Sequence, residues 1–168
     1  LDPARVWMTR RNATALDTPY PLLAVRADAA EPAVGGVSLF VDPARRTAGG
    51  QRARRGAEYC PPLDSLSSWR RLASTLAVKV SPALNEAEWP AEADEIEFVS
   101  WRGQCREAVL WFGVAGAARR RATVIGAESL TWDEEEAPGA PVGPAGAYLF
   151  EPDPAVVRSH LVGLLAQR

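Results

Sequence analysis

Two charged residues lie where apolar runs end or are interrupted, and both could belong to a polar site. Asp42 directly follows the run Val37–Val41 and opens an Asp-Pro-Ala-Arg segment that ends at Arg45. Lys79 lies inside a second apolar run, Leu76–Val80. An unpaired ammonium is costly there, so we expect Lys79 to reach the strand end or to pair with a carboxylate. The guanidinium of Arg45 is suited to pair with a phosphate or a carboxylate.

Other reactive side chains form no metal or redox spacing. The two cysteines are Cys60 and Cys105, and with a single histidine, His160, a His/Cys zinc site has too few ligands. We therefore predict no bound metal and two structural thiols in a reducing compartment. His160 falls in the last predicted helix, where we assign it no chemical role.

A basic segment follows Asp42 and predicts a loop, because residues 46–62 are rich in Gly, Arg and Pro. Its candidate RNA contacts are four arginines: Arg46, Arg52, Arg54 and Arg55. Such loops are also commonly just solvated, and both interpretations stand. The whole chain carries 19 basic and 21 acidic residues, a net charge of -2, so any attraction for RNA has to be local.

Size and composition indicate a globular protein of one domain, or parts of two. The chain has 168 residues, of which 47% are hydrophobic and 24% charged. Its apolar runs are far shorter than the roughly 20 residues that a membrane span needs. With no signal segment after Leu1, we predict a cytoplasmic protein without membrane contact. Because the first residue is not Met, we also expect the chain to begin within a longer protein.

The first part of the chain predicts alternating helices and strands. Asp2 followed by Pro3 is a helix-start signal, and the expected helix has Val6, Ala13 and Leu16 on its buried side. Apolar runs then predict strands at residues 22–26, 37–41 and 76–80, with a helical stretch within 63–76. The run at 37–41 suits a parallel strand that is covered on both faces.

The remaining sequence predicts a hairpin and then a change of character. Residues 96–101 and 105–112 form the two strands of the hairpin, and Gly113 marks a plausible boundary. Beyond it we expect strands at 122–125 and 147–150, an exposed loop over 133–146 and a helix over 154–167. The tryptophans are expected mainly in core or seam packing.

Segments spread over nearly the whole chain carry a family resemblance. They are Val41–Thr47 with Tyr59–Leu63, Val78–Pro82, Glu107–Gly113, Arg120–Val124 and Pro141–Asp153. Together they resemble the bacterial class I S-adenosylmethionine-dependent methyltransferases that carry a C-terminal THUMP-like domain. The resemblance implies an α/β fold: a partial Rossmann-like sheet over residues 1–113, ending in an antiparallel hairpin, and a small α+β THUMP-like domain over 114–168. The family's first strand and Gly-rich loop have no counterpart, so a fragment truncated at its N-terminus is expected.

The resemblance also implies a cofactor, S-adenosylmethionine, and residues to hold it. It places Asp2 at the ribose hydroxyls and Asp28, with Ala29, beside the adenine amino group. Asp2 as a plain helix cap, and Asp28 as a solvated loop acid, are the alternatives.

Asp42 and Pro43 occupy the family position beside the transferred methyl group. Asp42 is therefore implied as a cofactor contact and as an orienting acceptor or base, with a helix cap as the alternative. Related enzymes carry Asn/Asp-Pro-Pro-aromatic there, and Ala44 and Arg45 depart from that pattern. Lys79 is a further candidate for a role in this site.

The implied function is methyl transfer, with RNA as the favoured substrate because THUMP-type domains accompany RNA-modifying enzymes. We expect the fragment to be inactive alone. The alternative is a non-catalytic module that binds RNA or a protein.

Overall fold

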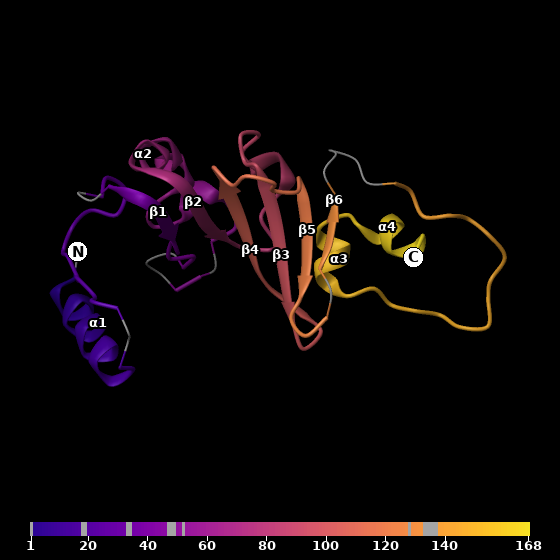
Figure 1. Ribbon diagram of the computed structural model, residues 1–168, viewed down its shortest axis with the longest axis horizontal. Coiled ribbons are helices and arrows are strands. Elements are labelled where there is room, and N and C mark those ends of the chain that lie inside the picture. Colours follow the sequence, from indigo (N-terminus) through magenta and orange to yellow (C-terminus); the bar gives the residue numbers. More distant parts are fainter. Residues whose placement is uncertain are drawn as a thin grey trace.

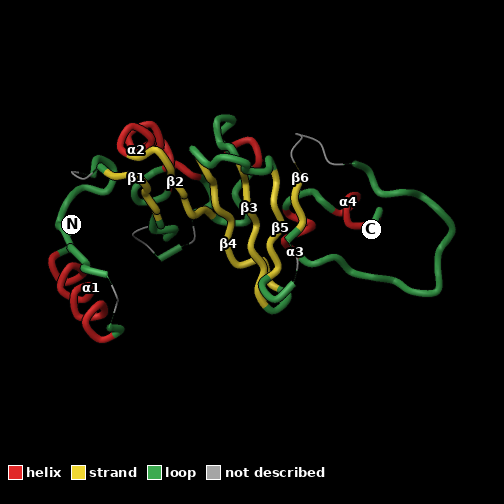
Figure 2. Tube along the Cα trace, viewed as in Figure 1, coloured by secondary structure: helices red, strands yellow, loops and turns green. Residues whose placement is uncertain are grey.

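The computed structural model describes residues 2–17, 20–32, 35–46, 50–51, 53–127, 129–132 and 138–168. Its centre is a six-stranded mixed sheet in the order β1-β2-β4-β3-β5-β6 (Figures 1 and 2). The strands are β1 Gly36–Val41, β2 Ala73–Val80, β3 Glu95–Trp101, β4 Gln104–Phe112, β5 Arg120–Val124 and β6 Leu130–Trp132. The helices are α1 Pro3–Ala15, α2 Leu66–Leu72, α3 Pro154–Arg158 and α4 Val162–Ala166, with short 3-10 turns η1 Gly56–Glu58, η2 Leu63–Ser65 and η3 Glu86–Glu88.

Strand directions bring several carboxyl ends to one edge of the sheet. β1 pairs with β2 in parallel, β4 is antiparallel to both β2 and β3, and β3 pairs with β5 in parallel. β1, β2, β3 and β5 therefore run the same way, and their carboxyl ends lie together. The predicted strands at 37–41 and 76–80, and the hairpin, are confirmed.

The hydrophobic core lies on one face of the sheet, where α2 packs on β2 and α3 packs on β3, β4 and β5. Its largest fully buried side chains include Trp69, Phe112, Leu110 and Leu161. Trp69 is thus a core residue, as predicted. Trp101 is 46% exposed at the hairpin end, so the expectation of core packing does not hold for that ring.

The N-terminal region makes little contact with the sheet. Asp2 caps α1 through a 2.9 Å hydrogen bond from the Ala4 amide, so the predicted helix start is confirmed. No residue of α1 is buried, so the predicted buried side is wrong: Leu16 is 76% exposed, and the helix contacts the following segment through the bond from Arg10 to the Ala24 carbonyl at 3.1 Å. Residues 22–26 form no strand, since no neighbouring strand pairs with them, and Leu23 is 82% exposed.

β1 lies at an edge of the sheet. Phe40 is 64% exposed, so the expectation that this strand is covered on both faces is not met within the described chain. An exposed aromatic on a parallel strand is uncommon, because such strands are usually buried. This face of β1 is therefore open apolar surface.

The C-terminal part differs from its prediction in two places. Residues 147–150 form no strand, because no other strand pairs with them, and the side chains of Tyr148, Leu149 and Phe150 are at least 82% exposed. The single helix expected over 154–167 is two short helices, because the chain turns at His160, where φ is 61°. Residues 138–146 are irregular, as expected of the loop there, and 133–137 lie outside the described residues.

The sheet continues across residue 113. Gly113 has φ 70°, and a Cβ there would lie 1.8 Å from the Ser74 carbonyl oxygen, so only glycine fits. β5, which follows, pairs with β3 in the same sheet. The division into residues 1–113 and 114–168 stays a prediction. Within the described ranges, no helix has the length and apolar character needed to cross a membrane.

Candidate active site

Asp42 and Lys79 meet at the carboxyl ends of two neighbouring parallel strands. The register aligns Val41 of β1 with Val78 of β2, so the next residue on each strand reaches the same face at the same edge. The ammonium of Lys79 donates to Oδ2 of Asp42 at 2.9 Å. Lys79 therefore has the carboxylate partner that its apolar surroundings required.

Glu107 of β4 joins these two residues to Arg45. Its Oε2 lies 3.0 Å from Nη2 of Arg45, and its Oε1 lies 3.7 Å from Nζ of Lys79. Arg45 also donates from Nη1 to the carbonyl oxygen of Val80 at 3.1 Å. Arg45 thus pairs with a carboxylate, one of its two expected partners. We call Asp42, Arg45, Lys79 and Glu107 the Asp42 cluster.

Accessibility within the Asp42 cluster increases towards Asp42. The side chains of Lys79 and Arg45 are 22% and 26% exposed, that of Glu107 is 33% exposed, and that of Asp42 is 49% exposed. Among the described residues, Oδ1 of Asp42 has no hydrogen-bond partner. The cluster has two positive and two negative groups, and its open oxygen can accept a hydrogen bond or a proton from a bound molecule.

The segment after β1 is fixed by the chain that returns beside it. Pro43 is buried, and Ala44 exchanges backbone hydrogen bonds with Cys60 at 2.8 and 3.0 Å. Tyr59 is 3% exposed, and its hydroxyl accepts from the Ser81 amide at 3.1 Å. Burial raises the pKa of this phenol. These contacts fix the position of the end of β1 relative to the end of β2.

The basic loop presents its side chains to solvent. Arg46, Arg54 and Arg55 are exposed, and Arg52 lies outside the described residues. The backbone amides of Arg54 and Arg55 donate to Oε2 of Glu58 at 2.7 and 3.3 Å. These bonds lower the pKa of the Glu58 carboxyl and hold it as an acceptor. The guanidinium of Arg46 donates from Nη1 to the Gly50 carbonyl at 3.1 Å, and the side chains of Arg54 and Arg55 are exposed.

The residues expected to hold the cofactor are not gathered around Asp42. Asp2 caps α1, and Asp28 accepts from the Ala30 amide at 2.9 Å. The Ala29 carbonyl accepts from the Trp69 indole at 2.8 Å. No contact among the described residues joins Asp2, Asp28 or Ala29 to Asp42. In the described part of the chain, the residues implied for the ribose and adenine therefore make local contacts of their own, whereas Asp42, Arg45 and Lys79 are brought together through Glu107.

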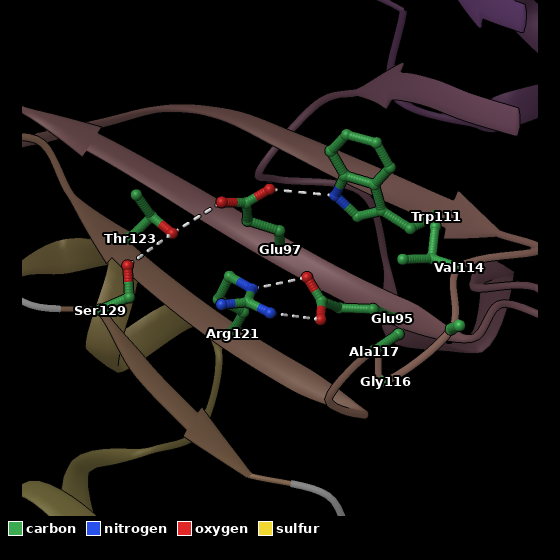
Figure 3. Close-up of a pocket in the computed structure, with 10 residues that line it drawn as sticks. Glu95, Glu97, Trp111, Val114, Gly116, Ala117, Arg121, Thr123 and Ser129 are labelled. Carbon is green, nitrogen blue, oxygen red and sulfur yellow. Dashed lines mark hydrogen bonds and ion pairs between the residues drawn. The ribbon is translucent and has the colours of Figure 1, made fainter. Parts of the chain in front are cut away.

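A shallow pocket of about 450 Å³ lies near the opposite edge of the sheet (Figure 3). Arg121 makes a two-point ion pair with Glu95 at 2.6 and 2.8 Å, which raises the pKa of the guanidinium. Glu97 accepts from the Trp111 indole at 3.0 Å and from the Thr123 hydroxyl at 2.6 Å. These polar groups pair with one another and fasten β3 to β4 and β5, so the pocket is chiefly a structural network.

Sequence reasoning found three members of the Asp42 cluster and missed Glu107. Asp42, Arg45 and Lys79 each carried a local signal at a strand end or inside an apolar run. Glu107 lies among alternating residues of a hairpin strand, where a glutamate is unremarkable. Only the order of the strands brings it beside Lys79.

Among the described residues, no group of three or more metal-ligating side chains is positioned to hold a metal ion.

A comparison with solved structures finds a protein of similar fold. The chain matches a crystal structure of a protein from Porphyromonas gingivalis W83 assigned to the methyltransferases, with a TM-score of 0.55 and 19% sequence identity. The match covers 77% of this chain and 35% of that protein. At this identity the likeness shows the fold alone: the sheet is one found in a methyltransferase structure.

Sequence comparison finds closer relatives. Two proteins from Mycobacterium tuberculosis, strains CDC 1551 / Oshkosh and H37Rv, are each 38% identical to this chain over 167 residues. Both are named uncharacterized S-adenosylmethionine-dependent methyltransferases. The alignment covers 96% of this chain, and the chain spans 45% of the length of each relative. No protein-family model matches the chain.

Proposed function

We propose that this chain contributes the methyl-acceptor side of an S-adenosylmethionine-dependent methyltransferase site, with Asp42 at the point of transfer. The observation that carries this proposal is the position of Asp42 at the carboxyl edge of parallel strands: Lys79 holds one carboxylate oxygen, and no described residue hydrogen-bonds to the other. Ligands of open α/β sheets bind at that edge. The names of the two relatives and the shared fold support the same reaction.

In this proposal the cofactor, when bound, would supply a methyl group on a sulfonium sulfur. The lone pair of the acceptor attacks the methyl carbon in line, and the carbon–sulfur bond breaks with its electron pair on sulfur, so that a neutral thioether leaves. Oδ1 of Asp42 accepts the N–H or O–H of the acceptor and takes its proton as the new bond to carbon forms. Lys79 stays on Oδ2 and fixes the plane of the carboxylate. The backbone bonds between Ala44 and Cys60 keep this segment in place while the acceptor binds.

The cofactor contacts of Asp2 with the ribose, and of Asp28 and Ala29 with the adenine, remain part of the proposal. Because they are not gathered around Asp42, we propose that the chain alone is inactive and binds S-adenosylmethionine weakly or not at all. Open apolar side chains such as Trp7 and Phe40, each 64% exposed, support a site that needs further protein around it. Calorimetric titration of the chain should show no one-to-one binding at micromolar concentration.

We propose RNA as the substrate class, in a cytoplasmic protein. The exposed guanidinium groups of Arg46, Arg54 and Arg55 follow the Asp42 segment and can pair with phosphates. Arg52 belongs to the same proposed surface, and residues 114–168 are proposed to form the THUMP-like domain. In a gel shift, Arg54→Gln/Arg55→Gln should weaken RNA binding and reduce its salt dependence. The matched control is Arg5→Gln/Arg11→Gln on α1, and equal losses in both variants would remove the loop from the proposal.

A second candidate is a non-catalytic module that binds RNA or a protein. The exposed aromatic side chains of Tyr148 and Phe150, at 82% and 84%, favour it, because such side chains serve as contact surface in binding modules. Methyl transfer by a longer protein that contains this sequence separates the two candidates. With tritium-labelled S-adenosylmethionine and total bacterial RNA, the enzyme incorporates label into the RNA, whereas the binding module retains RNA without incorporating label.

A further inference from the structure

We infer that Glu107 is a positioning residue for the Asp42 site, an inference whose catalytic part rests on the proposed methyl transfer. Glu107 lies on β4, which is antiparallel to β2. Asp42 and Lys79 lie at the carboxyl ends of the parallel strands β1 and β2. Its two carboxylate oxygens divide between two cations: Oε2 holds Arg45 at 3.0 Å, and Oε1 faces Lys79 at 3.7 Å.

Lys79 is therefore shared by two carboxylates of different kinds. Its hydrogen bond goes to Asp42 at 2.9 Å, and the longer ion pair to Glu107 approaches the same ammonium. A lysine side chain has several rotatable bonds, so a single contact with an open carboxylate leaves it free to adopt other rotamers. The second carboxylate restricts the ammonium to the space between the two strands. Through Lys79, Glu107 sets which oxygen of Asp42 is occupied and which stays open.

Arg45 gives Glu107 its own fixed position. The guanidinium holds Glu107 with Nη2 and the Val80 carbonyl with Nη1, so the carboxylate is tied to the backbone at the end of β2. The side chain of Glu107 is 33% exposed, so solvent screens its ion pairs and they contribute little to the stability of the fold. Its main effect is to fix the positions of the Arg45 and Lys79 side chains. We assign it no contact with substrate.

The composition of the chain offers a direct probe of this contact, because Lys79 is its only lysine. Acetylation by N-hydroxysuccinimidyl acetate, read on the peptide that contains Lys79, reports on the freedom of one ε-amino group. Glu107→Gln keeps the shape of the side chain and removes its charge. Acetylation of Lys79 should then accelerate between about 1.5-fold and fivefold, the range that a partly exposed ion pair allows.

Glu92→Gln is the matched control, since Glu92 is exposed and makes no contact with the Asp42 cluster. Its acetylation rate should equal that of the wild type, with folding of both variants checked by near-ultraviolet circular dichroism. Equal rates in folded Glu107→Gln and wild type would overturn the inference. If Glu107→Gln does not fold, Asp42→Asn decides, because Glu107 is then the charged partner of Lys79 that remains in the Asp42 cluster. Acetylation of Lys79 in Asp42→Asn, relative to free Nα-acetyl-lysine amide, should still rise with salt as this ion pair is screened, and a flat profile would overturn the contact.

The catalytic part is tested in a longer protein that contains this sequence. Glu107→Gln should lower kcat for methyl transfer while leaving KM for S-adenosylmethionine unchanged, and Glu107→Asp should restore part of kcat. An active wild type with an unchanged kcat in Glu107→Gln contradicts the positioning role. If the wild type transfers no methyl group, the proposed function fails, and the acetylation rates still decide whether Glu107 restrains Lys79.

Discussion

Nζ of Lys79 lies 2.9 Å from Oδ2 of Asp42, and this bond joins the carboxyl ends of β1 and β2. The two residues are 37 positions apart in sequence and reach each other because their strands are parallel neighbours in register. Oδ1 of Asp42, on the same edge, has no hydrogen-bond partner among the residues that the structure describes. The proposed chemistry depends on this division of the carboxylate into a held oxygen and a free one.

Replacement of Lys79 should affect the site more than the fold. In Lys79→Met, the free energy of unfolding should fall by no more than about 1 kcal/mol, because ion pairs with partly exposed groups contribute little. Urea denaturation followed by tryptophan fluorescence measures this loss. A loss of about 3 kcal/mol or more, the scale of a broken buried pair, would mean that the Lys79 contacts chiefly hold the sheet together.

The Glu95 and Arg121 pair should be important for stability. The side chain of Glu95 is 6% exposed, so Arg121→Met leaves a buried carboxylate without its cation and should cost about 3 kcal/mol in urea denaturation. Glu95→Gln/Arg121→Met should recover much of that loss. Arg5→Met is the matched control, since its pair with Asp2 joins side chains that are 82% and 55% exposed. If Arg121→Met and Arg5→Met lowered the free energy of unfolding equally, a buried ion pair between Glu95 of β3 and Arg121 of β5 would be ruled out.

Trp69 should anchor the N-terminal segment as well as the core. Trp69→Phe keeps most of the buried ring but removes the indole donor to the Ala29 carbonyl, a bond of 2.8 Å. We expect stability to fall by about 1–2 kcal/mol, from the lost hydrogen bond and the smaller ring. Trypsin should also cleave faster after Arg26. Unchanged cleavage at that bond would show that the indole does not hold this segment.

The two cysteines should differ sharply in reactivity. Burial raises the pKa of the Cys105 thiol to about 11, whereas Cys60 is exposed. At pH 8 only roughly one Cys105 in a thousand is the reactive thiolate, so iodoacetamide should modify Cys60 first. The Cys105 rate should rise about tenfold per pH unit up to pH 10. Peptide mass spectrometry measures both rates, and equal modification at pH 8 would contradict the burial of Cys105.

The same thiol predicts how stability changes at alkaline pH. The pKa of Cys105 is raised in the folded chain from an ordinary value of 9.0 to about 11, so the folded state keeps its proton after the unfolded state has lost it. Its contribution to stability is complete below pH 9 and is lost as the pH rises towards 11, an effect of about 1 kcal/mol for a partly buried thiol. Urea denaturation across this range should show a smaller decline in Cys105→Ala. A decline of the same size in both proteins would exclude Cys105 as its source.

Apolar runs in the sequence correctly predicted strands where a neighbouring strand of this chain is available to pair with them. Residues 37–41 and 76–80 form adjacent strands, and the hairpin forms because its two strands supply each other's hydrogen bonds. Residues 22–26 and 147–150 have equally apolar sequences, but no strand lies beside them to pair with. The last helix breaks at His160, where a left-handed turn brings Leu161 into the core, and helical periodicity alone does not show this.

The candidate site was predictable to the extent that its residues follow strands. Asp42 and Lys79 were marked by their positions relative to apolar runs, and their pairing follows once the strands are parallel. Glu107 required the register of a third strand, which no local pattern encodes. Asp2 caps a helix and Asp28 accepts from a nearby backbone amide, so the structure accounts for both locally, and their proposed cofactor contacts still depend on the resemblance.

Asp42→Asn tests the central claim most directly, in a longer protein that contains this sequence. Label transfer from tritium-labelled S-adenosylmethionine to RNA should fall by about 10²-fold or more, the usual contribution of a positioned proton acceptor. The melting temperature should remain close to wild type, and Asp64→Asn, an exposed acid outside the Asp42 cluster, should retain full activity. A folded Asp42→Asn protein with wild-type kcat would contradict the assignment of methyl transfer to this site.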